Sequence, residues 1–363
     1  MTKIAAVLWS GSVGGAETFT ADLCRTVREL GVGVGVVFVT RGEPLDERLT
    51  QAGILHASLG LARGRKVAQH PRALARCVEG LGPDGVLLPR GGYLAAALRI
   101  GGYRGRIVSV AHDAALDLGS VTLRDRLVRQ LDRTSGLWAS DVDVAVSDFV
   151  LTRMQRRRKR RAGRLVRIYN GVDLRVYADI PDTADREAVT IGYAGRLIEG
   201  KGVDTLLHAF AAGAAQEGAR LRITGDGPVR PMLQGLAAEL GLNGAVEFAG
   251  WTLDMPSFWR ACDFAVMPSN SFVESFGMAA VEAMACAKPV VATANGALPE
   301  VVEDGVTGLV VPRGDRVALA DALVRLTRDG DRRRAAGLAA RARCEQRFDI
   351  RDCAAAYLKL FQS

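Results

Sequence analysis

The sequence lacks most of the features that mark membrane, secreted and metal-binding proteins. Its longest apolar run, Gly31 to Val39, has about half of the roughly 18 residues that a membrane-spanning helix needs, and glycines interrupt it. The apolar stretch after Lys3 stops at a glycine-rich turn that begins at Gly11, so we expect no secretory signal. The six cysteines form no C-x-x-C pair, which argues against a zinc site and favours reduced thiols in a cytoplasmic protein.

Positive charge gathers in the first half of the chain. The 363 residues carry a net charge of +8, but residues 1–180 hold 28 Lys and Arg against 17 Asp and Glu, whereas residues 181–363 hold 20 against 23. The densest part runs from Arg153 to Arg167, with nine basic residues in fifteen. A basic half of this kind can meet a nucleic acid, an anionic membrane surface or a phosphorylated substrate.

Short apolar runs alternate with helical patterns in two arrays, separated by a polar break at 178–188. The expected strands are Lys3–Trp9, Val34–Val39, Gly85–Leu88, Arg106–Val110, Val142–Val146 and Leu165–Ile168 in the first array, and Val189–Ala194, Arg220–Thr224, Ala245–Ala249, Phe264–Met267 and Pro289–Thr293 in the second. This alternation predicts parallel strands with crossover helices. We therefore expect an α/β protein of two doubly wound domains, with ligands at the carboxyl ends of the strands.

The first candidate site is the glycine-rich turn Gly11-Ser12-Val13-Gly14-Gly15, which follows the first expected strand. Glycines let backbone N–H groups approach a ligand closely, and the N-terminus of the following helix favours negative charge. The spacing is not the full G-x-G-x-x-G fingerprint, so a tight turn that binds nothing stays open as an alternative.

The second candidate site is the loop Gly195 to Gly202, which contains Arg196 and Lys201 and follows the first strand of the second array. Such a glycine-rich loop can fold both cations over one anion. A diphosphate suits them, because Arg binds two oxygens at once and Lys supplies a point charge. The alternative is a pair of solvated surface cations, but the position at the carboxyl end of a strand favours a ligand.

The third candidate site contains Glu274 and Glu282, in the loop and helix after the expected strand Phe264–Met267. The N–H groups of Phe276, Gly277 and Met278 form a helix N-terminus that can bind an anion. A carboxylate beside it would accept hydrogen bonds from sugar hydroxyls rather than bind phosphate. A solvated face is the alternative for Glu282, and its alanine and valine neighbours argue against that alternative.

Two further motifs are ambiguous on the residues alone. His112-Asp113 follows an expected strand, where histidine can donate a hydrogen bond or act as a general base, although a lone histidine is more often structural. Asp141-Val142-Asp143 matches the D-x-D pattern that binds a metal in some sugar transferases. Its alternation with valine at the start of an expected strand favours a structural role, so we expect no metal site.

Seven motifs occur in order along the chain: Gly14-Gly15-Ala16-Glu17, Ile168 to Asp173, Gly195 to Gly202, Gly225-Asp226-Gly227-Pro228, the Glu274–Glu282 pair, Pro289 to Thr293 and Asp304 to Pro312. Together they strongly resemble glycosyltransferase family 4, the retaining nucleotide-sugar transferases of the GT-B fold. The resemblance is weaker from Phe38 to Ala139, which in this family shapes the acceptor site. It implies two Rossmann-like domains facing each other across a cleft: an acceptor-side domain at 1–177, a linker at 178–188, a donor domain at 189–348, and a terminal helix at 349–363 that packs back on the first domain.

The resemblance also implies roles for single residues. Arg196 and Lys201 would bind the donor diphosphate, Glu282 the donor ribose and Glu274 the transferred sugar. His112 would lie near that sugar. The implied catalytic set is His112, Arg196, Lys201 and Glu274, and the implied donor contacts are Gly14, Gly15, Arg196, Lys201, Glu274, Phe276, Gly277, Met278 and Glu282. The partners are then a nucleoside-diphosphate-sugar and a hydroxyl-bearing acceptor, with no cofactor and no metal.

The basic residues suggest where the acceptor lies. Arg124, Arg126, Arg129 and Arg133 alternate with leucine and valine as in a basic amphipathic helix. With the run after Arg153 they suggest an anionic acceptor surface, such as a lipid-linked acceptor at the cytoplasmic membrane face, although a solvated helix face explains the helix alone. The expected patch is Arg124, Arg126, Arg129, Arg156, Arg157, Arg158, Lys159 and Arg160.

Two other functions stay open. A nucleotide-sugar 2-epimerase shares the expected fold. A nucleic-acid-binding protein would use the basic run, but that run lacks the interleaved aromatic residues of a stacking platform, so we expect no nucleic acid partner.

Overall fold

The computed structural model describes residues 3–11, 14–62, 64–89, 92–112, 138–157, 164–178 and 188–362. The chain forms two compact units, one of Met1–Gly171 with Ile350–Ser363 and the other of Val172–Asp349. The first unit is therefore built from two separate parts of the chain. The expected linker at 178–188 lies outside the described residues except for its two end residues.

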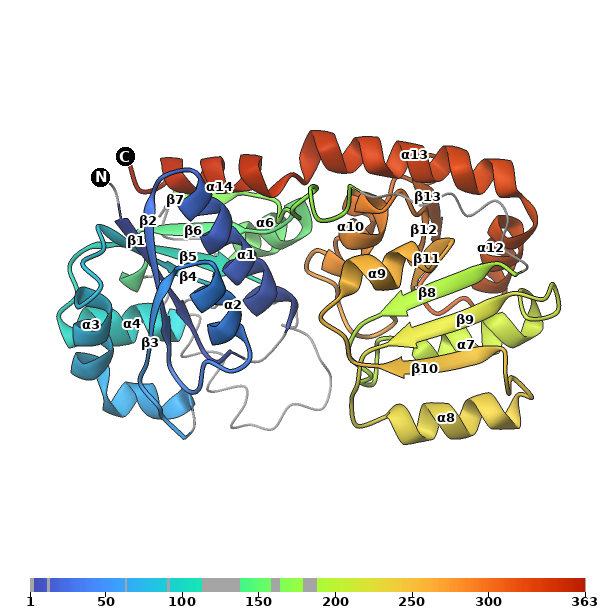
Figure 1. The fold of residues 1–363 in the computed structure, drawn as a ribbon, viewed down its shortest axis with the longest axis horizontal. Coiled ribbons are helices and arrows are strands. Elements are labelled where there is room, and N and C mark those ends of the chain that lie inside the picture. The colour runs from blue at the N-terminus through green and yellow to red at the C-terminus, as the bar shows by residue number, and fades with distance from the viewer. Residues whose placement is uncertain are drawn as a thin grey trace. The chain divides into compact units, whose positions relative to one another are not determined.

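The first unit is a seven-stranded, wholly parallel sheet in the order β3-β2-β1-β4-β5-β6-β7. Its strands are β1 (Lys3–Leu8), β2 (Gly33–Phe38), β3 (Leu55–Ser58), β4 (Gly85–Leu88), β5 (Arg106–Ala111), β6 (Val142–Ala145) and β7 (Arg164–Arg167). Its helices are α1 (Gly15–Glu29), α2 (Leu45–Gln51), the 3-10 helix η1 (Gly64–Gln69), α3 (Pro71–Glu79), α4 (Gly92–Gly101), α6 (Asp148–Arg157) and α14 (Ile350–Lys359) (Figure 1).

Helices α3 and α4 cover one face of this sheet, where Ala5 and Val7 of β1 join their buried side chains in one cluster. Helix α1 buries Phe19, Leu23 and Val27, as its 3.6-residue spacing predicts. It packs against α14, which reaches this unit from the far end of the chain.

The second unit is a six-stranded parallel sheet in the order β10-β9-β8-β11-β12-β13. Its strands are β8 (Thr190–Ala194), β9 (Arg220–Thr224), β10 (Val246–Gly250), β11 (Phe264–Met267), β12 (Val290–Thr293) and β13 (Gly308–Val311). Its helices are α7 (Val203–Ala212), α8 (Arg230–Glu239), α9 (Met255–Arg260), α10 (Met278–Ala285), α11 (Leu298–Val301), α12 (Arg316–Arg328) and α13 (Gly330–Arg347).

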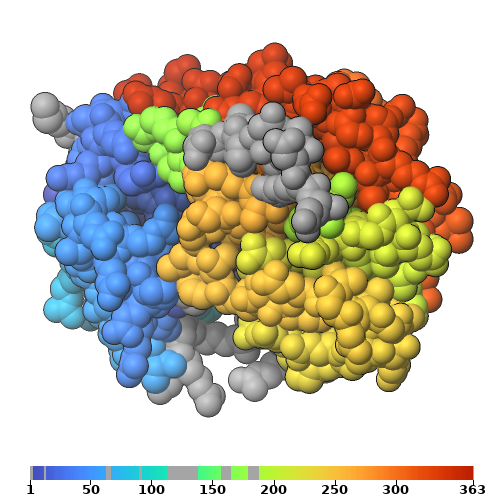
Figure 2. Space-filling view, turned by 45° about the vertical axis from the view of Figure 1, so that its right-hand side comes forward, coloured from blue at the N-terminus to red at the C-terminus, as the bar shows by residue number. Residues whose placement is uncertain are grey.

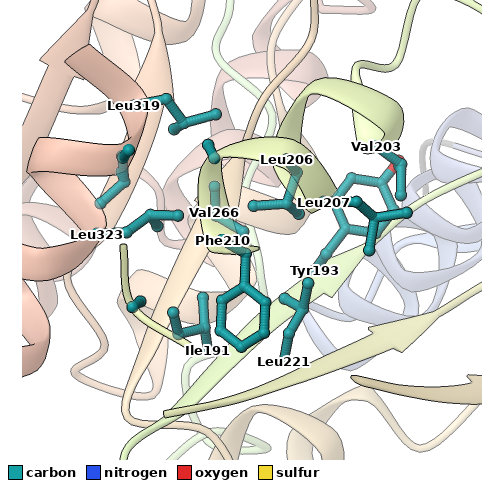
Figure 3. Packing of buried hydrophobic residues seen from close by; sticks show 14 of the residues in the cluster. Ile191, Tyr193, Val203, Leu206, Leu207, Phe210, Leu221, Val266, Leu319 and Leu323 are labelled. Carbon is teal, nitrogen blue, oxygen red and sulfur yellow. The ribbon is translucent and has the colours of Figure 1, made fainter. Parts of the chain in front are cut away.

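The core of the second unit lies between its sheet and helices α7, α8 and α12. Figure 3 shows Leu206 and Phe210 of α7 beside Ile191 and Leu221 of the sheet. Helix α13 packs against α10. Its outer side forms part of the red surface in Figure 2, and Leu338 on α13 is 61% exposed.

The strand order reverses once in each sheet, between β1 and β4 in the first unit and between β8 and β11 in the second. In open α/β sheets the ligand crevice lies outside the carboxyl ends of the strands at such a reversal. The prediction of an α/β chain with two doubly wound, Rossmann-like units is therefore confirmed.

Two strands escaped prediction. β3 is an edge strand whose four residues are exposed or half-buried, so it carries no apolar run. β13, Gly308–Val311, lies within the motif Asp304 to Pro312, where no strand is predicted from the sequence. No helix in the described part of the chain is long and apolar enough to cross a membrane.

Candidate functional site

The site of the second unit is built around the loop between β8 and α7. This loop packs on the Gly225-Asp226-Gly227 turn after β9, where a Cβ at Gly225 would lie 1.9 Å from the Gly195 carbonyl oxygen. A Cβ at Gly227 would lie 2.1 Å from the Leu197 carbonyl oxygen, and the Leu197 N–H donates to the Asp226 carbonyl at 2.9 Å. The two glycines thus let one loop support the backbone around Arg196.

The same loop meets the loop that follows β11. The carbonyl oxygen of Gly200 accepts hydrogen bonds from the N–H groups of Asn270 at 2.8 Å and Phe272 at 3.1 Å. Gly202 has a φ of 74°, and a Cβ there would lie 1.9 Å from the Pro268 carbonyl oxygen. Lys201 stands between these two glycines, so its backbone position is set by the β11 loop.

The β11 loop is held in turn by the residues that follow β12. The Asn295 side-chain amide, 2% exposed, lies 2.8–2.9 Å from the carbonyl oxygens of Ser269, Asn270 and Phe272. The Ala297 N–H donates to the Glu274 carbonyl at 2.8 Å. Loops after three neighbouring strands therefore form one hydrogen-bonded assembly at the carboxyl edge of the sheet.

This assembly brings together the cations and one of the acids predicted from the sequence. Lys201 Nζ lies 2.8 Å from Glu274 Oε1, and both side chains are 15% exposed. The Ser269 hydroxyl donates to the same carboxylate oxygen at 2.5 Å. A charge-assisted pair that is shielded from water in this way is stronger than an exposed ion pair.

The ring of Phe272 joins the second cation to the assembly. Its centroid lies 4.1 Å from Lys201 Nζ and 5.5 Å from the Arg196 guanidinium carbon. The buried Tyr193 hydroxyl donates to the Arg196 carbonyl at 3.4 Å. Burial raises the pKa of Tyr193, and the nearby Glu274 charge raises it further, so this phenol stays neutral and can donate.

Helix α10 begins directly after the β11 loop, at Met278. Gly277 is its N-cap residue, with a φ of 103° and no side chain of its own to cap the first turn. Phe276 is buried against the ring of Phe348, with centroids 5.6 Å apart, and Met278 is the first helical residue. Glu282, on the second turn, is half-buried and accepts a long hydrogen bond of 3.5 Å from Trp259 Nε1.

In the first unit, Gly14 precedes α1 and Gly15 begins it, with the Thr18 N–H bonded to the Gly14 carbonyl at 2.9 Å. A Cβ at Gly11 would lie 1.5 Å from the Gly42 carbonyl oxygen, so the turn approaches the backbone after β2 closely. His112 follows β5 and is half-buried, with its ring edge-on to Phe19 of α1 at 5.7 Å. The structure thus brings His112 against the helix that Gly14 and Gly15 open.

The remaining sequence predictions fall in two groups. Asp141 accepts a hydrogen bond from the Ile107 N–H at 2.7 Å and forms an ion pair with Arg99 at 2.6 Å. Asp143 lies in β6 and accepts a hydrogen bond from the Ser140 hydroxyl at 2.9 Å. Both aspartates therefore have structural roles in the first sheet. Arg156 is exposed at the end of α6, and the backbone of Arg157 ends that helix. Asp113, Arg124, Arg126, Arg129, Arg158, Lys159 and Arg160 lie outside the described residues.

Sequence reasoning missed the residues that hold the charged groups in place. Phe272 and Asn295 act through contacts between loops that are far apart in the chain, and no periodicity marks them. Ser269 and Tyr193 bond groups only five and three residues away, the Glu274 carboxylate and the Arg196 carbonyl, and no sequence motif assigns them that role. Position in the chain could have indicated Asn295, because this residue follows β12 at the same carboxyl edge of the sheet as the predicted site.

Two family models for glycosyltransferases match this chain, one in each half of the sequence. A family model for "Glycosyl transferases group 1" matches residues 188–329, and a model for "Glycosyltransferase Family 4" matches residues 13–176. The D-inositol 3-phosphate glycosyltransferase of Saccharomonospora viridis is 35% identical over 231 residues, covering 55% of this chain and 53% of that protein. The N-acetyl-alpha-D-glucosaminyl L-malate synthase of Bacillus anthracis is 29% identical over 255 residues, covering 68% and 65%. The match thus spans about half to two thirds of these two curated relatives.

Solved structures share the fold over the full chain. Anabaena HepE, crystallised in complex with UDP-glucose, superposes with a TM-score of 0.82 at 25% identity, covering 99% of this chain and 100% of that one. Sucrose-phosphate synthase from Thermosynechococcus elongatus superposes with a TM-score of 0.81 at 21% identity, covering 100% and 98%.

The contact between the β8 and β11 loops predicts the effect of adding one methyl group. Gly202→Ala places a Cβ against the Pro268 carbonyl in a left-handed backbone, so we expect the free energy of unfolding of the second unit to fall by about 2–4 kcal/mol. Gly218→Ala is the control, because Gly218 has the same φ of 74° but nothing within 4 Å of an added Cβ. Its loss should be about 1 kcal/mol. Urea unfolding measures both, and equal losses would mean that the loop contact is not tight.

Proposed function

Since the chain belongs to glycosyltransferase family 4 of the group 1 glycosyl transferases, we propose that it is a retaining glycosyltransferase that moves a sugar from a nucleoside-diphosphate-sugar to an acceptor hydroxyl. One observation carries the proposal: beside the strand reversal of the second sheet, the ring of Phe272 contacts both Arg196 and Lys201, and Lys201 pairs with Glu274. Two cations suit a diphosphate, and a carboxylate suits sugar hydroxyls. The UDP-glucose bound to HepE supports a nucleotide-sugar donor here.

The chemistry follows from where charge develops. When the bond between the sugar and the diphosphate breaks, negative charge grows on the leaving diphosphate. Arg196 and Lys201 stabilise that charge, and the N-terminus of α10, which begins after Gly277, adds its partial positive charge. Preorganised groups of this kind are usually the largest single contribution to catalysis. The acceptor oxygen then bonds to the anomeric carbon from the face that the diphosphate vacates, and the hydroxyl proton passes to the departing phosphate oxygen, without a covalent enzyme intermediate.

Glu274 has a second role in this scheme. In the structure its carboxylate pairs with Lys201 and accepts from Ser269. Donor binding replaces that pair by a Lys201–phosphate contact and frees the carboxylate to accept hydrogen bonds from the transferred sugar. His112, in the first unit, supplies a ring nitrogen that can hydrogen-bond a sugar hydroxyl. Glu282 is proposed to hold the donor ribose.

We also propose that the reaction needs no metal. Arg196 and Lys201 supply the positive charge that a divalent cation would otherwise bring to the diphosphate. The D-x-D motif Asp141-Val142-Asp143 is engaged in the first sheet, because the Asp141 carboxylate pairs with Arg99 and accepts a hydrogen bond from the Ile107 N–H.

A nucleotide-sugar 2-epimerase of the same fold is the competing enzyme. The two are separated by incubating the enzyme with a nucleotide-sugar and no acceptor. An epimerase changes the sugar under these conditions, whereas a transferase leaves it in place or slowly transfers it to water.

The acceptor is proposed to be anionic or to sit at an anionic surface, with a lipid-linked acceptor at the cytoplasmic membrane face as the leading version. The support is the charge distribution, since residues 1–180 hold 28 Lys and Arg against 17 Asp and Glu. Each basic residue near an anionic surface adds about 1 kcal/mol to binding, and the attraction fades within a Debye length.

The first test removes the diphosphate-binding cations. Arg196→Ala or Lys201→Ala should lower kcat/KM by a factor that corresponds to a loss of about 2–4 kcal/mol of transition-state stabilisation. This is the loss typical of removing one preorganised hydrogen-bond donor. Glu282→Ala should instead mainly weaken donor binding. Arg325→Ala, which removes an exposed cation from α12 of the same unit, is the control and should change neither. A loss of turnover below threefold in the Arg196 and Lys201 variants would reject their assignment.

The second test concerns stereochemistry and metal. The product should keep the anomeric configuration of the donor sugar, and EDTA should leave most of the activity intact. NMR of the anomeric signal reports the first, and a chelator titration reports the second. Inversion, or complete loss of activity in EDTA, would contradict the mechanism.

The third test concerns the basic residues. Vesicles with anionic lipids should bind the protein at low salt and largely release it at high salt. Replacing Arg156, Arg157, Arg158, Lys159, Arg160 and Arg161 together with Gln should abolish binding while the circular dichroism spectrum stays unchanged. A wild-type protein that ignores anionic vesicles at low salt would favour a soluble acceptor.

A further inference from the structure

Phe272 occupies an unusual position among the charged groups of the site. Its ring centroid lies 4.1 Å from Lys201 Nζ and 5.5 Å from the Arg196 guanidinium carbon, so one ring contacts both cations. A cation within about 6 Å of an aromatic ring is attracted by the negative face of the ring. The two cations have like charge and stand five residues apart in one loop, so a shared attractive surface offsets their repulsion.

The ring itself is anchored through its backbone. The Phe272 N–H donates to the Gly200 carbonyl at 3.1 Å, and the Phe272 carbonyl accepts from Asn295 Nδ2 at 2.9 Å. These bonds tie Phe272 to the loop that carries Lys201 on one side and to the residues after β12 on the other. The ring therefore has a fixed base from which to position flexible side chains.

An aromatic ring has an advantage over a carboxylate at this place. A carboxylate would neutralise the cations and would have to be displaced by a diphosphate, as Glu274 must be displaced from Lys201. The ring face orients a cation without neutralising it. Lysine in particular has a flexible four-carbon stem, and it needs a second partner to stay in place when its ion pair opens.

We propose that Phe272 is a positioning residue, which holds Arg196 and Lys201 together in the geometry that meets the donor diphosphate while Lys201 exchanges Glu274 for phosphate. The proposal rests on the proposed function and adds to it the residue that preorganises the two cations. Its effect should appear mainly in kcat, because alignment of the cations matters most when charge develops on the leaving diphosphate.

The test compares ring removal with ring retention. Phe272→Leu keeps an apolar side chain without the aromatic face, and we expect it to lower kcat about 10- to 30-fold while KM for the donor changes less than threefold. Phe272→Tyr keeps the face and should stay within threefold of the wild type. Phe258→Leu is the matched control, because it removes a ring that contacts Arg222 at 5.9 Å rather than the site cations, and it should leave kcat within threefold.

A double-mutant cycle separates positioning from a merely structural role. In a Lys201→Ala background one of the two cations is already gone, so Phe272→Leu should cost less than about fivefold there. An equal loss in both backgrounds, or a Phe272→Tyr variant as impaired as Phe272→Leu, would overturn the proposal.

A binding measurement distinguishes an error in the role of Phe272 from an error in the proposed function. Calorimetry with UDP, GDP and ADP identifies the tightest of the three, and its affinity is then measured for each variant. If Arg196→Ala and Lys201→Ala bind it as the wild type does, the proposed function is wrong. If those variants lose affinity and turnover while Phe272→Leu matches the wild type in both, only the role of Phe272 is wrong.

Discussion

The close approach of two backbone segments, Gly200 to Gly202 and Pro268 to Phe272, is the constraint on which the site depends. The contact exists because no Cβ stands at Gly202, where it would lie 1.9 Å from the Pro268 carbonyl oxygen. Lys201 is fixed between the two glycines, and Phe272 is fixed by its bond to the Gly200 carbonyl. Contacts between the two backbone segments thus determine where the side chains of Lys201 and Phe272 begin.

Without a donor, the two cations of the site have different partners. A shielded cation is costly unless it has a partner, and Lys201 has one in Glu274. Arg196 instead lies over a ring, which leaves its hydrogen-bond donors available for oxygen atoms. The arrangement is therefore ready for an anion before one arrives.

Sequence reasoning reached the fold and the charged residues because both leave local signals. Buried parallel strands such as β4 and β11 read as continuous apolar runs, and Arg196 and Glu274 follow strands at the carboxyl edge. The edge strand β3 is largely exposed and left no such run. The supporting residues, Phe272 and Asn295, left none either, because their partners lie in loops tens of residues away and a loop has no period. A structural role for Asp141 could be predicted from its position at the start of an expected strand. Its bonds to Arg99 and to the Ile107 N–H agree with that prediction.

Helix α14 belongs to the first unit, although it follows the whole second unit in the sequence. It packs on α1, Cys353 Sγ contacts the Tyr169 carbonyl at 3.1 Å, and the ring of Phe361 lies where Gly85 has no Cβ. During translation, all of Val172–Asp349 must leave the ribosome before Ile350 does, an interval on the order of 10–40 s at usual elongation rates. The apolar side of α1 stays uncovered by α14 for that time. The second unit is continuous in the chain and can finish folding first, whereas the first unit must wait for a segment that is synthesised after the second unit.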